Sequence, residues 1–274
     1  VAVIDGGVDI IHPELSNAMW VNADEIPNNH IDDDNNGYTD DYNGYGFGDN
    51  TPVINSHPHG THVAGTIGAV SNNGNGMAGI AGGSGNGNGV RIMSLATFGT
   101  YQNGGFEAAM VYAADNGAVI SQNSWGGGST AIEAAINYFI ERAGLDNTSA
   151  NFNSKLQIGP MAGGVVVFAA GNDGGAVSYP ASYPPVIAVA ATDRSDFKAS
   201  FSNFGPQIDI SAPGVNILST VPSRYGSYSF ASGTSMACPH VSGVAALIVS
   251  KEGGPGLVPA YVKTRLVTSA DPLE

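Results

Sequence analysis

The chain has 274 residues, of which 9 are basic and 23 acidic, giving a formal net charge of −14 at pH 7. This acidic balance argues against nucleic acid and anionic membranes as partners, and it favours solubility and cation binding. The single cysteine, Cys238, forbids an intrachain disulfide. No apolar run approaches the roughly 20 residues of a membrane span, and the chain opens inside a strand-like run without a signal peptide, as a processed core would.

Short apolar runs alternate with amphipathic segments along the chain. The runs typical of buried strands are 1–4, 90–96, 118–123, 165–169 and 186–190, and the segments typical of helices are 59–69, 106–116, 130–142, 235–251 and 259–268. This alternation predicts an α/β fold in which a mostly parallel sheet is covered by helices on both faces. We expect one domain over 1–274, with an acidic insertion at about 22–51.

The first apolar run ends in Asp5, which is followed by two glycines. A buried parallel strand delivers a carboxylate to its C-terminal end in this way, and open α/β sheets bind their ligands at that edge. An aspartate after a strand is also an ordinary turn former. Asp5 therefore gains a chemical meaning only if partners lie nearby.

Three histidines open the first predicted helix, in the segment His57-Pro58-His59-Gly60-Thr61-His62. We expect His59 to be a general base and His62, one turn further, to be structural. A His-x-His pair also occurs in metallohydrolase barrels. That alternative lacks ligands here, because the chain has only six histidines and none lies between 62 and 240.

The segment 232–240, SGTSMACPH, opens an apolar helix at Ser235. A serine in this position is often a plain helix cap. A serine hydroxyl becomes a nucleophile when a base takes its proton and a third group orients the base. Asp5, His59 and Ser235 follow one another in one of the known orders for such a triad. Cys238, in the helix interior, is expected to be a small buried residue rather than a nucleophile.

Taken together, these motifs resemble the subtilase family of serine endopeptidases (peptidase family S8). The resemblance is carried by VIDGGVD at 3–9, HGTHVAG at 59–65 and GTSMACPH at 233–240, with support from VFAAGN at 167–172. It implies a subtilisin-like three-layer sandwich and an endopeptidase acting through an acyl-enzyme. It also implies catalytic roles for Asp5, His59 and Ser235, and an oxyanion hole made by Asn172 and the backbone N–H of Ser235. An ordinary turn is the alternative for Asn172.

The resemblance also indicates where an extended substrate would pair with the chain. The segment SWGGG at 124–128 resembles the family's substrate-binding segment, and 169–171 would line the facing wall. The expected substrate contacts are Ser124, Trp125, Gly126, Ala169, Ala170, Gly171 and Ser178. With Ser178 near its floor, the pocket before the scissile bond is expected to be roomy and uncharged, and to favour large apolar side chains.

The acidic insertion predicts a calcium site. Residues 24–50 hold eight carboxylates and no lysine or arginine. The spacing of 32–40 matches positions 1, 3, 5, 6, 7 and 9 of a calcium loop, although Asn43 stands where an EF-hand has glutamate. The predicted ligands are Asp32, Asp34, Asn36, Tyr38 through its carbonyl, Asp40 and Asp41. We expect structural Ca²⁺ in the loop 32–43 because the carboxylates would otherwise repel one another; a solvated acidic loop is the alternative.

A second calcium site follows from the resemblance alone. Glu14 and Asn73 match family ligands, together with carbonyls of the loop 71–77, but an N-terminal ligand that the family supplies is absent from this chain. We expect this site to be weakened or empty.

The remaining expectations concern partners and location. The substrates would be proteins or peptides, the protein would be secreted or at the cell surface, and it would be a monomer made with a pro-segment outside this chain. A pseudoprotease or a calcium-dependent binding module with the same fold is the non-enzymatic alternative.

Overall fold

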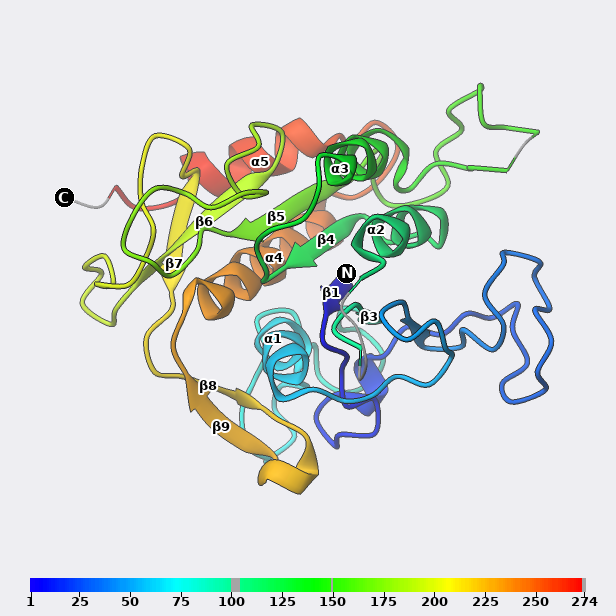
Figure 1. The fold of residues 1–274 in the computed structure, drawn as a ribbon, viewed down its shortest axis with the longest axis horizontal. Helices are drawn as coiled ribbons and strands as arrows, with labels where there is room; N and C mark the ends of the chain where they lie inside the picture. Colours follow the sequence, from blue (N-terminus) through cyan, green and yellow to red (C-terminus); the bar gives the residue numbers. More distant parts are fainter. Residues whose placement is uncertain (100–103, 149, 273–274) are drawn as a thin grey trace.

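The computed structural model describes residues 1–99, 104–148 and 150–272 (Figure 1). Within them, seven strands form one sheet in the order β2-β3-β1-β4-β5-β6-β7, and every neighbouring pair is parallel. The strands are β1 (Ala2–Asp5), β2 (Gly44–Gly46), β3 (Met93–Ala96), β4 (Ile120–Asn123), β5 (Val165–Ala169), β6 (Ile187–Thr192) and β7 (Ile210–Pro213).

Helices cover both faces of this sheet. They are α1 (Pro58–Gly68), α2 (Phe106–Asp115), α3 (Ala131–Arg142), α4 (Thr234–Glu252) and α5 (Pro259–Thr268). Ile4 and Phe168 pack with α2 and α3 in one core cluster. Val3 packs with α1, and Val167 packs with α4 and α5, on the opposite face. Because both faces are buried, the strands are apolar at successive positions. The predicted α/β three-layer architecture is confirmed.

Each of the five predicted strands and five predicted helices has a counterpart in the structure, with ends that differ by a few residues. Four strands were not predicted. β2 is three residues long and contains two glycines, and β7 lies at the sheet edge, where burial is incomplete. β8 (Ile217–Thr220) and β9 (Tyr228–Ala231) form a separate antiparallel ribbon that packs on α1 (Figure 1). A short, partly exposed hairpin carries a weak apolar signal.

Two features lie outside the sandwich. The part of the acidic insertion that precedes β2, drawn in blue, extends away from the sheet as a long irregular segment (Figure 1). Short 3₁₀ helices occur at η1 (Ser16–Ala18) and η2 (Ser223–Tyr225). None of the helices in the described ranges combines the length and apolar character needed to cross a membrane.

Candidate active site

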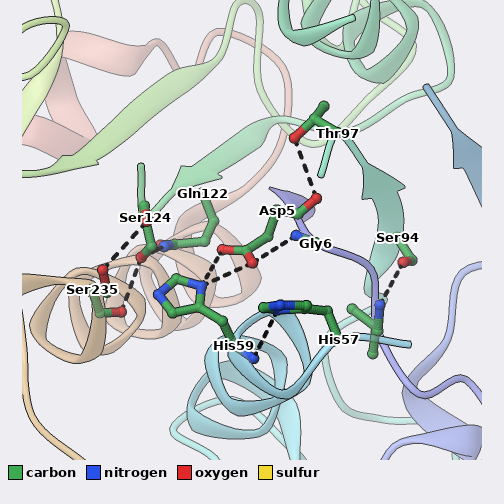
Figure 2. A network of polar contacts seen from close by, with 10 residues as sticks. Asp5, Gly6, His57, His59, Ser94, Thr97, Gln122, Ser124 and Ser235 are labelled. Carbon is green, nitrogen blue, oxygen red and sulfur yellow. Dashed lines mark hydrogen bonds and ion pairs between the residues drawn. The ribbon is translucent and has the colours of Figure 1, made fainter. Parts of the chain in front are cut away.

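The carboxyl end of β1 brings Asp5 against His59. Asp5 is buried, and both of its carboxylate oxygens lie 2.9 Å from Nδ1 of His59. The backbone N–H of Gly6 also donates to Oδ1 of Asp5 at 2.7 Å. The carboxylate is therefore held by its own chain and aimed at the imidazole (Figure 2).

The helix that carries His59 can reach β1 because the next residue is glycine. A Cβ on Gly60 would lie 2.6 Å from the carbonyl oxygen of Gly7 and 3.1 Å from Oδ1 of Asp5. Any larger residue would push α1 away from the strand. The helix also begins here for a local reason, since His57 accepts a hydrogen bond from the His59 N–H at 3.2 Å and Pro58 occupies the first turn.

The surroundings of His59 favour its protonated form. Burial of the ring would lower the pKa of His59, but the negative charge of Asp5 and its hydrogen bond outweigh that effect and raise this pKa above the ordinary value. An imidazole held in this way keeps its Nδ1 proton directed at Asp5, which leaves Nε2 to act as a base.

Ser235 lies in the first turn of α4, on the other side of the His59 ring from Asp5 (Figure 2). Ser124 holds it at two points, because the Ser124 hydroxyl donates to the Ser235 carbonyl at 2.9 Å and the Ser124 carbonyl accepts from the Ser235 hydroxyl at 3.3 Å. The hydroxyl thus bonds to Ser124 rather than to His59 in this state. Hydrogen bonds between catalytic groups are often long before substrate binds.

A polar residue that the sequence analysis did not single out holds Ser124 through a hydrogen bond. Gln122, fully buried on β4, donates from Nε2 to the Ser124 hydroxyl at 2.8 Å (Figure 2). Its Oε1 accepts from Ser242 at 2.5 Å and from the Cys238 thiol at 3.3 Å. The polar run Ser121-Gln122-Asn123 at the end of an apolar segment was the available signal. Burial raises the pKa of Cys238 to about 12, so the thiol is not a nucleophile at neutral pH.

Asn172 and the Ser235 N–H border one common space. Oδ1 of Asn172 accepts from the Thr234 N–H at 2.8 Å and from the Thr234 hydroxyl at 3.0 Å, so the Nδ2 group is the end of the amide left to bind a ligand. A Cβ placed on Gly233 would lie 3.6 Å from the Ser235 nitrogen and 3.7 Å from Asn172 Nδ2. Both nitrogens thus lie next to the position that a side chain on residue 233 would take.

Among the predicted substrate residues, the side chains of Trp125 and Ala170 are packed in the core. Trp125 packs its ring against Phe106 and Phe168, with centroid separations of 4.4 and 4.9 Å. The Ala170 side chain is also fully buried. The others are Ser124, Gly126, Ala169, Gly171 and Ser178; Ser178 accepts a hydrogen bond from Asn203 Nδ2 at 3.0 Å.

The acidic insertion gathers three carboxylates, but not the set that the loop register predicts. One oxygen each from Glu25, Asp32 and Asp34 lies within 4.8 Å of the others, and no other group of three or more histidine, cysteine or acidic ligands occurs in 1–99, 104–148 and 150–272. Carboxylate oxygens at this spacing suit Ca²⁺. Glu25 was not predicted as a ligand because it precedes the twelve-residue loop. His57, His59 and His62 form no metal centre.

Asp40 and Asp41, also predicted as ligands, are not among the three clustered carboxylates. Asp40 accepts from the backbone N–H groups of Asn29 at 3.0 Å and His30 at 3.1 Å. Asp41 is fully buried, and it accepts from the Tyr112 hydroxyl at 2.6 Å and from Asn36 Nδ2 at 2.8 Å. The ring of Tyr38 packs on Tyr45, Phe47 and Tyr112. Two of these residues contact the cluster: Asn36 donates from Nδ2 to Asp34 at 3.0 Å, and the Asp40 N–H donates to Glu25 at 3.0 Å.

Glu14 and Asn73 lie together, as the second calcium prediction requires. Glu14 accepts three hydrogen bonds: from Asn73 Nδ2 at 2.7 Å, from the Tyr228 hydroxyl at 2.9 Å and from the Met77 N–H at 3.3 Å. Glu14 is fully buried. Three neutral donors therefore already satisfy this carboxylate, and the amide presents its nitrogen, not its oxygen, to the acid.

Comparison with known proteins agrees with this geometry. The sequence profile of the subtilase family (Peptidase_S8) matches residues 1–274. The chain is 37% identical over 257 residues to the thermophilic serine proteinase of Bacillus sp. strain AK1, covering 92% of this chain and 52% of that protein. It is 37% identical over 254 residues to thermitase of Thermoactinomyces vulgaris, covering 92% and 75%. It thus spans about half of the first relative and three quarters of the second.

A third relative and a solved structure extend this similarity. The extracellular protease of Xanthomonas campestris pv. campestris is 39% identical over 299 residues, covering 98% of this chain and 47% of that protein. The crystal structure of a cold adapted subtilisin-like serine proteinase matches with a TM-score of 0.67 and 30% identity, covering 98% of this chain and 81% of that one. Profile, relatives and fold agree over nearly the whole length, and the chain therefore belongs to the subtilase family.

Proposed function

We propose that this chain is the catalytic domain of a serine endopeptidase that hydrolyses peptide bonds through an acyl-enzyme intermediate. The observation that carries the proposal is the pairing of Asp5 with His59 at 2.9 Å, with Ser235 on the far side of the imidazole. Family membership supports the same conclusion.

In the proposed mechanism, Oγ of Ser235 attacks the carbonyl carbon of the scissile bond while Nε2 of His59 takes its proton. Asp5 stabilises the imidazolium that forms. The developing oxyanion is bound by the Ser235 N–H and Asn172 Nδ2, whose nitrogens both lie within 3.7 Å of the Cβ position at Gly233. His59 then gives the proton to the leaving amine, and water hydrolyses the acyl-enzyme by the reverse sequence of proton transfers.

Substrate would bind as an extended strand between 124–126 and 169–171, through main-chain hydrogen bonds. Because Ser178 is neutral and Asn203 holds its hydroxyl, we expect a preference for large apolar residues before the scissile bond. A digest of a peptide library tests both activity and preference. Cleavage after large apolar residues supports the proposal; a clear preference for lysine or arginine contradicts the uncharged pocket.

We also propose that Glu25, Asp32 and Asp34 hold a structural Ca²⁺. Their carboxylates are close together, and all three members of the cluster are acidic. The ion would neutralise them and fix the insertion against the sheet. At Glu14 a single carboxylate faces the amide nitrogen of Asn73 and not its oxygen, which supports a weakened second site.

For the protein in its biological setting, we propose secretion, a pro-segment outside this chain, monomeric action and protein or peptide substrates. Support comes from the net charge of −14 and from a relative named as an extracellular protease. Recovery of the protein in the culture medium after expression from its own full-length gene tests secretion. Retention inside the cell would contradict it.

A further inference from the structure

Asn203 is a buried asparagine outside all of the motifs described above, in the connection between β6 and β7. It lies behind the turn 170–175, which carries Asn172. Its side-chain amide makes four hydrogen bonds to this turn and its continuation. Nδ2 donates to the Ala170 carbonyl at 3.1 Å and to the Ser178 hydroxyl at 3.0 Å, and Oδ1 accepts from the N–H groups of Asp173 at 2.9 Å and Gly175 at 3.1 Å.

The backbone of Asn203 adds a fifth bond, from its N–H to the Gly171 carbonyl at 3.0 Å. Both neighbours of Asn172 in the chain, Gly171 and Asp173, are therefore bonded to Asn203. The turn wraps closely around the amide, since Gly171 has a φ of +104° and a Cβ there would lie 2.3 Å from Asn203 Nδ2. A side chain on residue 171 would displace the amide.

Asn172 is consequently fixed from two directions. Its side-chain oxygen is held by Thr234 at the start of α4, and its flanking peptides are held by Asn203. The distance between Asn172 Nδ2 and the Ser235 N–H depends on both attachments. A donor aimed at an oxyanion loses much of its effect when it moves by a fraction of an ångström.

We propose that Asn203 is a positioning residue for the oxyanion hole, which sets where the Asn172 amide stands relative to Ser235. Its side chain holds the peptide after Asn172 and its backbone N–H holds the peptide before it, so a substitution of Asn203 releases the first peptide and keeps the second. This inference rests on the proposed function. Because Asn203 Nδ2 also donates to the Ser178 hydroxyl, the same side chain adjoins the proposed pocket for the residue before the scissile bond. Asn203 does not touch the reacting atoms, and it acts through Asn172.

A double-mutant cycle tests the proposal, using Asn203→Ala, Asn172→Ala and the combined variant. The substrate is a peptide with a large apolar residue immediately before the scissile bond. With Asn172 present, we expect Asn203→Ala to lower kcat by about 10- to 100-fold, with KM changed by less than about threefold. In the Asn172→Ala background, the same change should lower kcat by less than about twofold. Equal losses in both backgrounds would overturn the proposal.

The same cycle separates this inference from the proposed function. If Asn172→Ala alone leaves kcat unchanged, the oxyanion role of Asn172 fails, and the position of Asn203 has nothing to act through. If Asn172→Ala lowers kcat but the two changes are multiplicative, only the positioning role fails.

Two further variants exclude a merely structural explanation. Gln157 is a matched control remote from Ser235, since its amide also links loops, bonding Gly159, Gly254 and Gly256 at 2.9 to 3.0 Å. Gln157→Ala should lower the melting temperature without lowering kcat. Asn203→Leu keeps the approximate shape without the hydrogen bonds and should lose kcat as Asn203→Ala does; restored kcat would mean that Asn203 only fills space. If Asn203→Ala does not fold, Asn203→Ser, which leaves room for a water molecule, replaces it in the cycle.

Discussion

The edge of the sheet around Ser235 and the acidic insertion are both rich in polar residues, yet they are organised by different means. At the edge, a parallel strand and two helix starts position Asp5, His59 and Ser235 close together. The motifs that hold these residues therefore predict the arrangement from the sequence. In the insertion, residues 24–43 contain no helix or strand, so loop conformation alone brings the carboxylates together. Asn35 and Asp40 adopt positive φ values of 58° and 54°, and the Asp40 carboxylate accepts from the backbone of Asn29 and His30.

Motif spacing therefore predicts which residues lie together where strands and helices set the geometry, and it does so less well in an irregular loop. The edge is expected to control rate, and the insertion to control stability.

Removal of the nucleophile or the base should abolish the rate without unfolding the protein. By analogy with subtilisin, Ser235→Ala or His59→Ala should lower kcat on the order of 10⁶-fold. The melting temperature should change little in Ser235→Ala, whose side chain lies outside the apolar core, whereas His59→Ala should lower it because the buried Asp5 carboxylate loses its partner. Steady-state peptide hydrolysis and thermal unfolding measure the two quantities. Residual activity within tenfold of the unmodified enzyme would contradict the triad.

Removal of the second oxyanion donor should cost less. Asn172→Leu should reduce kcat by about 10²- to 10³-fold, the range measured for the corresponding donor in subtilisin. KM should stay nearly constant, because the lost interaction forms mainly in the transition state. Measuring kcat and KM separately on one peptide checks this. A loss that falls on KM would show that Asn172 binds substrate instead.

Calcium removal should act on the insertion and on stability. At free Ca²⁺ of 100 times the dissociation constant, the ion adds about 2.7 kcal/mol. Excess chelator should therefore lower the melting temperature by roughly 5–10 °C. Glu25→Gln should shrink this shift, whereas Asp24→Asn, at an exposed carboxylate of the same insertion, should leave it intact. Equal shifts in both variants, or no shift with chelator, would contradict the site.

The pH dependence should separate rate from stability at the edge itself. Because the pKa of His59 is raised above its usual value of about 6.5, the acid limb of kcat/KM should have its midpoint above pH about 6.5. Stability should respond in the opposite sense. A group with a raised pKa in the folded state stabilises the fold below its unfolded pKa, and this contribution is lost as pH rises through the folded pKa.

Asp5→Asn provides the control for the pH prediction. Loss of the carboxylate removes both effects that raise the pKa of His59, so the midpoint of the acid limb should move to lower pH while kcat falls. Activity that rises toward pH 4 in the unmodified enzyme would contradict His59 as the base.

Much of the fold and of the edge could be read from the sequence because long apolar periodicities and ordered motifs report on regular structure. Residues fixed by contacts between distant segments could not. Glu25 joins Asp32 and Asp34 only after the loop folds, and Asn203 reaches Asn172 across about 30 residues of chain. The ribbon β8–β9 was missed because its strands are short and half-exposed.

The most direct test of the account is covalent labelling with a fluorophosphonate probe, with the modified residue identified by peptide mass spectrometry. An activated serine reacts with such a probe and an ordinary helix cap does not. The account predicts labelling at Ser235 in the unmodified protein and its loss in His59→Ala. Labelling that persists without His59, or that misses Ser235, would contradict the Asp5–His59–Ser235 site.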